Sequence, residues 1–374
     1  MTGGTSIQSI GTTLVDVPLR RPHRVATQSI AAQSMVLVRV RTSDGVEGIG
    51  EAVVPGGPWW GGESVEGMQA LIDRYLAPLL HGQDARRVGY LAHSLDRAIG
   101  GGQFAKAGVE MALWDALGKY HGVPLYDLLG GLHRDAVPVT WALGADPVAE
   151  VVAEARARQA SHGHTSFKLK MGAGDPAADV ARVTHIAAEL ADQASVRVDL
   201  NGSWDELTAR RLLPALQDAG IDMVEQPVAA WNLAALADLT GRLTIPIMAD
   251  ESLRGPHDAS TLIRQRAADV FAVKLAKLGG VAALRDTVAV AQTAGVPCHG
   301  GTTIESSIGT AAAAHVYCAT GGVTAGSELF GPLLLADDLV KDPVRYESGQ
   351  VSPPSGPGLG VTLDEEQVAR YTRR

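Results

Sequence analysis

The chain has few of the features that mark secreted or nucleic-acid-binding proteins. It contains only two cysteines, Cys298 and Cys318, among 374 residues, which excludes a disulfide framework, and their spacing does not match a cysteine metal site. It lacks a run of basic residues, and its net charge of −9 argues against a surface for nucleic acid or anionic membrane. We therefore expect two reduced, buried thiols and no nucleic-acid partner.

The sequence also lacks the patterns of an export signal and of a membrane-spanning segment. Residues 1–10 contain neither the basic region nor the apolar segment of a signal peptide. The longest run without charged residues, 306–327, is interrupted by glycine, serine, threonine and His315, so we interpret it as a small-residue helix and loop. The sequence thus predicts a cytoplasmic protein with no membrane partner.

Length and patterning predict two structural parts. With 46% hydrophobic residues, the chain can form two domains with a large core. Residues 35–41 and 46–53 alternate like strands around Asp44-Gly45, a pair typical of a β-hairpin turn. Residues 105–121 have a helical pattern with many small side chains. The first third is therefore predicted to be an α+β unit.

From residue 137 onward, short apolar segments alternate with alanine-rich helical segments. The predicted strands are 137–143, 166–170, 196–200, 223–225, 245–250, 270–275, 296–300 and 324–329. Polar residues at the strand ends recur every 24 to 29 residues, which fits one strand, one helix and two loops. Regular repeats of this kind predict a parallel barrel.

Carboxylates end three consecutive predicted strands, at Asp199, Glu225 and Asp250. In parallel barrels this end of each strand carries the chemistry. Three oxygen ligands from neighbouring strands, with room left for water and substrate, suit Mg²⁺ or Mn²⁺. Zinc is not expected because no histidine or cysteine joins the cluster. The alternative, separate helix caps or surface charges, does not explain three matching positions.

Lysines lie on both sides of these carboxylates. Lys168 and Lys170 share one face of their strand because alternate residues point to the same side, and Lys274 ends a strand across the barrel. Buried ammonium groups need negative partners, which the carboxylates supply. Neighbouring positive charges lower a lysine pKa, so a lysine here could act as acid or base in a reaction through an ene-diolate. A purely structural ion pair is the alternative.

The stretches that contain these residues resemble the muconate-lactonizing subgroup of the enolase superfamily. The similar stretches are residues 105–119, FKLKMG at 167–172, RVDLNGSW at 197–204, VEQP at 224–227 and IMADES at 247–252; residues 326–340 and 357–374 are most similar to muconate cycloisomerases. The resemblance covers the whole chain. It implies an α/β fold, a modified TIM barrel (β/α)7β at 133–338, with an α+β capping domain built from residues 1–132 and completed by residues 339–374.

The resemblance also implies a role for each candidate site residue. Asp199, Glu225 and Asp250 would bind one divalent cation, Mn²⁺ or Mg²⁺. Lys168 would contact a substrate carboxylate and tune Lys170, and Lys170 and Lys274 would be the two opposed acid or base candidates. The remaining expected catalytic or substrate-binding residues are Glu328, His23, Trp59 and Asn201. The pair Trp59-Trp60 departs from the smaller or single aromatic residues that are usual in this cap loop.

The implied activity is the metal-dependent interconversion of cis,cis-muconate and muconolactone through an ene-diolate, in catechol degradation by the β-ketoadipate pathway. The expected enzyme is a homo-oligomer that acts on a small dicarboxylate. The alternatives are chloromuconate cycloisomerase, N-acylamino-acid racemase, dipeptide epimerase and o-succinylbenzoate synthase. Dipeptide epimerases carry an Asp-x-Asp pair on the last strand, which Glu328-Leu329-Phe330 lacks. The complete lysine set disfavours a barrel that only binds small acids.

Four further residues near the site are given structural interpretations. A related subgroup uses a histidine after the seventh strand with an aspartate on the sixth. The sixth strand here ends in Lys274, so we expect His299 to be structural or to line the pocket. Cys298 is expected in the core, Glu251 to point away from Asp250, and Lys277 to be a surface or loop charge.

Overall fold

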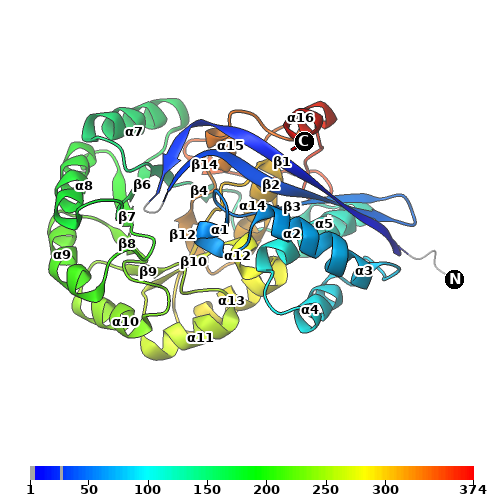
Figure 1. Cartoon of the computed structure of the whole chain (residues 1–374), viewed down its shortest axis with the longest axis horizontal. Coiled ribbons are helices and arrows are strands. Elements are labelled where there is room, and N and C mark those ends of the chain that lie inside the picture. The colour runs from blue at the N-terminus through cyan, green and yellow to red at the C-terminus, as the bar shows by residue number, and fades with distance from the viewer. Residues whose placement is uncertain (1–4, 26–27) are drawn as a thin grey trace.

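Two structural parts lie side by side in the chain, a ring of strands surrounded by helices and an antiparallel sheet with its own helices (Figure 1). The computed structural model describes residues 5–25 and 28–374. Residues 1–4 of the segment examined for an export signal lie outside the described residues. Within the described ranges, every helix is too short or too polar to span a membrane.

The cap begins with three antiparallel strands, β1 (Ile7–Arg24), β2 (Ser29–Thr42) and β3 (Glu47–Val53). The predicted hairpin is confirmed: Val38 pairs with Gly50, and Gly45 in the turn has a φ of 87°, which favours glycine. The helices of this part are α1 (Pro58–Gly61), α2 (Val65–Leu71), the π-helical turn η1 (Ile72–Leu76), α3 (Ala77–Leu80), α4 (Val88–Ala98), α5 (Gln103–His121) and α6 (Leu125–Leu128).

Helix α5 packs directly against β3. A Cβ atom added at Gly50 would lie 2.1 Å from the carbonyl oxygen of Gly108, and one added at Gly48 would lie 2.0 Å from that of Ala112. The small residues in both elements are therefore what allows the helix to approach the strand so closely. The helix predicted for residues 105–121 is confirmed and begins two residues earlier, at Gln103.

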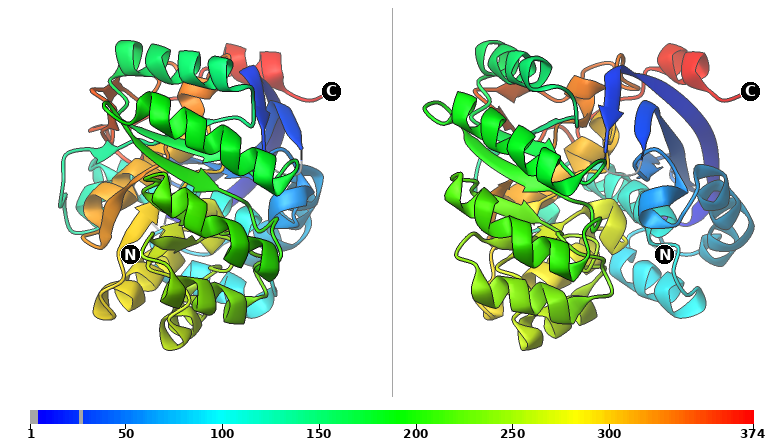
Figure 2. Two further views of the ribbon diagram at one scale, coloured as in Figure 1. Left: turned by 90° about the vertical axis from the view of Figure 1, so that its left-hand side faces the viewer. Right: turned by 60° about the vertical axis from the view of Figure 1, so that its left-hand side comes forward.

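The second part is a barrel of eight parallel strands in sequential order. The strands are β5 (Trp141–Leu143), β6 (Ser166–Lys170), β7 (Ser195–Asp199), β8 (Met223–Glu225), β9 (Ile247–Ala249), β10 (Val270–Val273), β11 (Cys298–Gly300) and β12 (Val323–Ser327). The helices between them are α7 (Val148–His162), α8 (Pro176–Leu190), α9 (Glu206–Asp218), α10 (Leu233–Arg242), α11 (Pro256–Gln265), α12 (Leu275–Leu278), α13 (Val281–Thr293) and α14 (Ser307–Ala319). Figure 2 shows the green helices of this region as a layer outside the strands. The predicted (β/α)7β architecture is thus confirmed.

The single strand predicted for residues 137–143 is wrong, because the chain changes sheet within it. β4 (Val137–Pro138) pairs with β14 (Gln350–Val351) in a small antiparallel sheet, whereas β5 belongs to the barrel. Between them, Val139 forms a parallel bridge to Ser327 of β12, and the Thr140 amide donates to the Ser327 carbonyl oxygen at 2.7 Å. This crossover closes the ring of strands.

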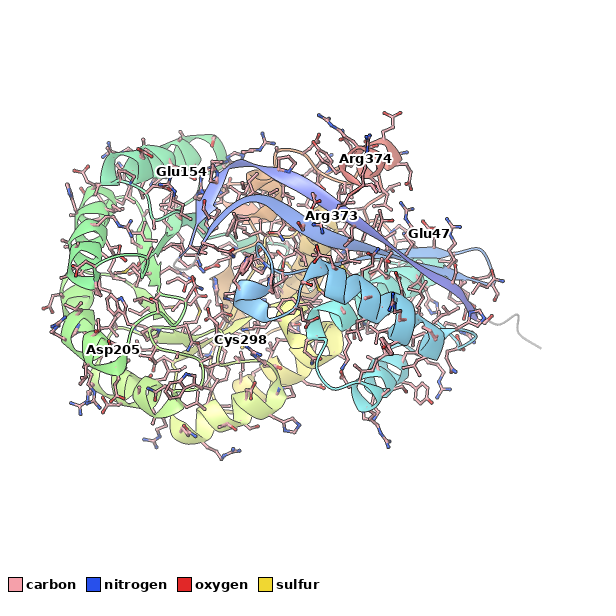
Figure 3. The ribbon with its side chains drawn as sticks, in the orientation of Figure 1. Glu47, Glu154, Asp205, Cys298, Arg373 and Arg374 are labelled. Atoms are coloured by element: carbon pink, nitrogen blue, oxygen red, sulfur yellow. The ribbon has the colours of Figure 1, made fainter. Side chains whose placement is uncertain are left out.

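The C-terminal segment returns from the barrel to the cap sheet. Its elements are α15 (Gly331–Leu334), β13 (Tyr346–Glu347), β14 and α16 (Glu365–Tyr371). Beyond α16, Thr372 bridges Val15 of β1, and the Arg373 guanidinium binds both carboxylate oxygens of Asp16 at 2.6 and 2.7 Å. Figure 3 shows Arg373 beside the cap strands. The domain boundaries at residues 132 and 338 stay predictions.

Candidate active site

Strand β6 places two lysines inside the barrel, as the alternation of its residues predicted. Phe167 and Leu169 are fully buried in the hydrophobic core. Lys168 and Lys170 point to the opposite side, where they line the pocket between barrel and cap, with only 3% and 7% of their surfaces exposed. Each ammonium group therefore needs a negative partner close by.

Lys168 is held by three carboxylates. Its Nζ lies 2.6 Å from Glu328 Oε2, 2.8 Å from Glu225 Oε2 and 3.3 Å from Asp199 Oδ2. Burial alone would lower the pKa of Lys168, but the charges of Glu225, Glu328 and Asp199 outweigh it and raise the pKa well above its ordinary value. Three carboxylates therefore hold Lys168 in place as a positive charge.

Lys170 lies on the same face of β6 and has fewer charged partners than Lys168. Its Nζ donates to Asp199 Oδ2 at 2.5 Å and to Asn201 Oδ1 at 3.1 Å. Asn201 follows β7 with a φ of 45°, a conformation that asparagine tolerates better than most residues, and lines the pocket. One carboxylate and one amide thus hold Lys170 at the pocket wall.

The structure brings Asp199, Glu225 and Asp250 together below the lysines. Asp199 and Glu225 are register partners on β7 and β8, Asp250 follows β9, and all three are buried. Burial and the charge of Asp199 raise the pKa of Glu225 well above its ordinary value, with smaller contributions from Glu328 and Asp250. The carboxylates are therefore close enough to repel one another.

Ammonium groups separate these carboxylates from the pocket. Among residues 5–25 and 28–374, no three Asp, Glu, His or Cys side chains converge closely enough to hold a metal ion as they stand. Lys168 and Lys170 contact Asp199, and Lys274 contacts Asp250. The metal-binding role of the three carboxylates consequently stays a prediction.

Lys274 reaches the pocket from the opposite side of the barrel, because β10 and β6 are four strands apart. Its Nζ lies 2.6 Å from Asp250 Oδ2 and 4.1 Å from the centroid of the Trp60 ring. Burial would lower the pKa of Lys274, but Asp250 and Glu225 outweigh burial and raise it. A Cβ atom added at Gly301 would lie 2.6 Å from the Lys274 side chain, so glycine leaves room for it.

Lys277 is not the surface charge that we expected. It is buried, and its Nζ donates to Asp250 Oδ1 at 2.7 Å, to the Asp250 carbonyl oxygen at 2.6 Å and to the Ala272 carbonyl oxygen at 2.9 Å. Lys274 caps α12, and Lys277 follows one helical turn later on the same side. That spacing of three residues was the signal that could have found it.

Glu328 follows β12 and joins the barrel centre to His299. One carboxylate oxygen binds Lys168, and the other, Oε1, lies 3.5 Å from His299 Nε2. Burial lowers the pKa of His299, which also contacts the Ala325 carbonyl oxygen through Nδ1 at 2.8 Å. His299 is thus buried behind Glu328, and burial raises the pKa of the Cys298 thiol to about 12, so this thiol stays protonated.

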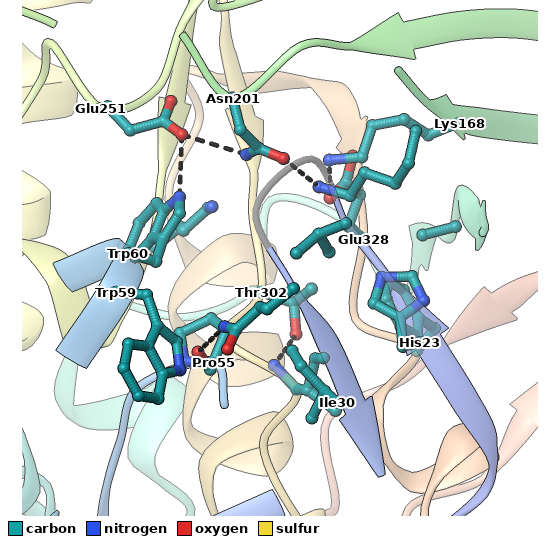
Figure 4. Close-up of a pocket in the computed structure, with 17 residues that line it drawn as sticks. His23, Ile30, Pro55, Trp59, Trp60, Lys168, Asn201, Glu251, Thr302 and Glu328 are labelled. Atoms are coloured by element: carbon teal, nitrogen blue, oxygen red, sulfur yellow. Dashed lines mark hydrogen bonds and ion pairs between the residues drawn. The ribbon is translucent and has the colours of Figure 1, made fainter. Parts of the chain in front are cut away.

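The cap covers the pocket with His23, Trp59 and Trp60 (Figure 4). His23 is buried; burial, followed by the charges of Lys170, Arg21 and Lys168, lowers the pKa of His23 well below its ordinary value. Trp59 is 63% exposed and lies at the pocket entrance. The structure therefore brings both predicted cap residues to the site.

Glu251 lines the pocket. The expectation that its side chain points to the other side of the strand, away from Asp250 and the site, is therefore wrong. Glu251 Oε1 accepts hydrogen bonds from Trp60 Nε1 at 2.8 Å and from Asn201 Nδ2 at 3.0 Å (Figure 4). Strand β9 ends at Ala249, so the alternation of side chains no longer applies two residues later. These bonds connect the cap to the wall that holds Lys170.

Comparisons with known proteins agree with this geometry. Residues 9–130 match the mandelate racemase / muconate lactonizing enzyme N-terminal domain, and residues 150–367 match the enolase C-terminal domain-like family. The chain belongs to the mandelate racemase / muconate lactonizing enzyme family of the enolase superfamily. It is 50% identical to muconate cycloisomerase 1 of Rhodococcus opacus over 98% of this chain and 99% of the relative.

Solved structures of this enzyme family have the same fold. Muconate lactonizing enzyme from Pseudomonas fluorescens, complexed with muconolactone, superposes with a TM-score of 0.97 at 44% identity, covering 99% of this chain and all of that chain. 2-Chloromuconate cycloisomerase from Rhodococcus opacus 1CP superposes with a TM-score of 0.96 at 46% identity and the same coverage. The chain is therefore an enzyme, an isomerase, and members of its superfamily depend on divalent metal ions.

The residues of this family member fit a hard divalent cation. The charges at this site are the buried carboxylates of Asp199, Glu225, Asp250 and Glu328, the half-buried carboxylate of Glu251, and the buried ammonium groups of Lys168, Lys170, Lys274 and Lys277. The carboxylates outnumber the ammonium groups by five to four, and the Oε2 atom of Glu251 is buried without a hydrogen-bond donor. Carboxylate oxygens are the donors that Mg²⁺ and Mn²⁺ prefer.

Proposed function

We propose that this chain is a muconate cycloisomerase that interconverts cis,cis-muconate and muconolactone in catechol degradation. The observation that carries the proposal is the position of Lys170 and Lys274, which reach one pocket from opposite walls above a carboxylate cluster. A planar substrate between them presents one face to each lysine. Each lysine is therefore placed to exchange a proton with a carbon next to a carboxylate, on its own face of the substrate.

The reaction can be written with this chain's own groups. One muconate carboxylate oxygen forms a bond to a carbon of the diene, and the displaced electron pair moves toward the second carboxylate, which becomes an ene-diolate. The ammonium group of Lys170 or Lys274 then gives its proton to the carbon next to that carboxylate. The neutral lysine regains a proton from water, and the reverse reaction removes the same proton.

The other site residues hold charge and orientation in this proposal. Asp199, Glu225 and Asp250 would hold one Mn²⁺ or Mg²⁺ ion, whose charge would stabilise the ene-diolate. Lys168, fixed by Glu328, would stabilise a substrate carboxylate without transferring a proton. His23, Asn201 and Trp59 line the pocket and would contact the substrate.

A second candidate substrate is a chlorinated muconate. The similarity to 2-chloromuconate cycloisomerase, at 46% identity, is as strong as that to several muconate enzymes. Dipeptide epimerase is disfavoured, because Phe330 places a buried aromatic ring in the pocket two residues after Glu328, where that activity needs a carboxylate. We expect a cytoplasmic homo-oligomer. Gel filtration with light scattering would measure its mass.

The direct test follows the loss of ultraviolet absorbance as the diene of cis,cis-muconate is consumed. The purified chain is mixed with the substrate and Mn²⁺ or Mg²⁺, and muconolactone is identified by NMR. The same assay with 2-chloromuconate compares the two candidate substrates through kcat/KM. The double variant Lys170→Ala/Lys274→Ala is the control for background reaction. Unchanged absorbance with metal present contradicts the proposal.

A further inference from the structure

Ile304 has a backbone conformation that is rare for a β-branched residue. Its φ is 62°, in the left-handed region, where the Cβ atom crowds a backbone carbonyl oxygen. In the described ranges, the other non-glycine residues with positive φ are Asn201, Gln226, Arg266 and Ser348, and none of them is β-branched. Conformations of this kind persist only where the surrounding structure enforces them.

The strained residue lies at the active site. Ile304 belongs to the loop between β11 and α14, on the barrel face that carries the strand-end lysines. It is 3% exposed and lines the pocket together with Ile30, Pro55 and Phe330. These side chains form an apolar wall, which faces a pocket that also contains the lysine ammonium groups.

Hydrogen bonds on both sides hold Ile304 in this conformation. Glu305 Oε1 accepts from the Thr303 amide at 2.8 Å and from the Thr303 hydroxyl at 2.7 Å, while Glu305 Oε2 accepts from the Thr302 hydroxyl. The Ile304 amide in turn donates to Thr302 Oγ1 at 3.0 Å. The buried Glu305 carboxylate therefore fixes both residues that precede Ile304.

The loop is also fixed to the cap and to the barrel. The Ser306 amide donates to Glu51 Oε1 of β3 at 3.1 Å, and its hydroxyl donates to Glu51 Oε2. A Cβ atom added at Gly331 would lie 2.1 Å from the Glu305 carbonyl oxygen, so the barrel packs tightly on the other side. The loop cannot relieve the strain by shifting as a whole.

We propose that Ile304 determines substrate specificity, because the loop holds its side chain against the carbon chain of the bound dicarboxylate. The identity of that substrate rests on the function proposed above. A muconate has charged ends and a flat apolar middle; one charged end meets Lys168, and the middle meets the apolar wall. A substituent on the middle carbons must fit against Ile304, which limits the substituted muconates that the pocket accepts.

Melting temperatures test whether the backbone is strained. At an ordinary position glycine is less stabilising than alanine, whereas at positive φ the order reverses. Ile304→Gly is therefore expected to melt at a higher temperature than Ile304→Ala. The matched control is Ile245, which is 4% exposed at the opposite end of the barrel and has an ordinary φ, so Ile245→Gly is expected to melt below Ile245→Ala. If the glycine variant melts below the alanine variant at both positions, the inference that Ile304 is strained is wrong.

Steady-state kinetics test the contact with substrate. Ile304→Ala and Ile304→Gly are expected to raise KM for cis,cis-muconate about tenfold, a typical effect of lost apolar contact. The ratio of kcat/KM for 2-chloromuconate to that for muconate is expected to rise several-fold, whereas Ile304→Val and both Ile245 variants keep the wild-type ratio. An unchanged ratio in active Ile304 variants overturns the specificity role. A wild-type chain without activity on muconate overturns the proposed function instead, and with it the substrate named here.

Discussion

Lys274 directs its ammonium group at the face of Trp60, with Nζ 4.1 Å from the ring centroid. The same indole donates through Nε1 to Glu251 Oε1 at 2.8 Å, and Glu251 binds Asn201, which binds Lys170. One cap residue is thereby connected to both lysines. The position of Trp60 in the cap and the placement of the two lysines are therefore linked through direct contacts.

Two substitutions of Trp60 separate its contacts. Trp60→Phe keeps an aromatic ring over Lys274 but loses the hydrogen bond to Glu251, and kcat/KM is expected to fall about 10- to 100-fold, because hydrogen bonds to charged groups contribute about 1.5–3 kcal/mol. Trp60→Leu also loses the cation–π contact, which contributes about 0.5–2 kcal/mol, so its kcat/KM is expected to fall further. Trp231→Phe, at a tryptophan that is 82% exposed, is the control. Equal losses in the two Trp60 variants would show that the ring contact is irrelevant.

Replacement of the pocket lysines should identify the proton donor. Lys170→Ala or Lys274→Ala is expected to lower kcat by about 10²–10⁴-fold if the removed lysine transfers the proton. The exposed Lys341→Ala variant should keep wild-type activity. Reaction in D₂O, with the deuterium position in muconolactone assigned by NMR, reports which face is protonated. Full activity in both pocket variants contradicts the lysine mechanism.

Removal of metal should abolish activity reversibly. Treatment with EDTA is expected to stop turnover, and Mn²⁺ or Mg²⁺ is expected to restore it, because the carboxylate cluster would hold the cation. Asp250→Asn is expected to retain less metal after gel filtration, as elemental analysis would measure, whereas the exposed Asp192→Asn should match the wild type. Full turnover by a protein shown to contain no metal would contradict the predicted metal dependence.

Stability is expected to fall as pH rises from about 4.5 to 8, in part because of Glu51. Burial raises the pKa of Glu51 to about 8, and the hydrogen bond from Ser306 only partly offsets it. The folded chain then keeps a proton that the unfolded chain loses near pH 4.5. This stabilisation is complete below that pH and is lost toward pH 8, at about 1.4 kcal/mol per pH unit.

The variant Glu51→Gln carries no titrating proton at this position. Its free energy of unfolding in urea, measured between pH 5 and 8, is expected to depend less on pH than that of the wild type. Glu347→Gln, at an exposed position, should show the wild-type slope. If Glu51→Gln has that slope as well, the carboxyl is not protonated in the folded protein.

The barrel and the strand-end charges were predictable from the sequence because local rules determine them. The bounds of β6 and β8 match the predicted strands, and alternation placed Lys168 and Lys170 on one face. Once the strands run parallel and in order, their final residues must meet at one end of the barrel. The grouping of Asp199, Glu225 and Asp250 follows from that topology alone.

The remaining features depend on contacts between distant segments. Glu251 lies beyond the end of its strand, so alternation could not orient it, and its partner Trp60 is 191 residues away in the sequence. The positive φ of Ile304 results from a loop fixed by Glu51 of the cap. No pattern within the local sequence encodes either contact.

The ion pair between Asp16 and Arg373 joins residues 357 positions apart and has a consequence for folding. The barrel lies between these residues in the chain, and each of its units contacts mainly its neighbours along the sequence. Contacts between sequence neighbours form with little loss of loop entropy, whereas contacts across hundreds of residues depend on what has already folded. This topology favours an order of events in which the barrel forms first and serves as the template on which the two chain segments of the cap meet.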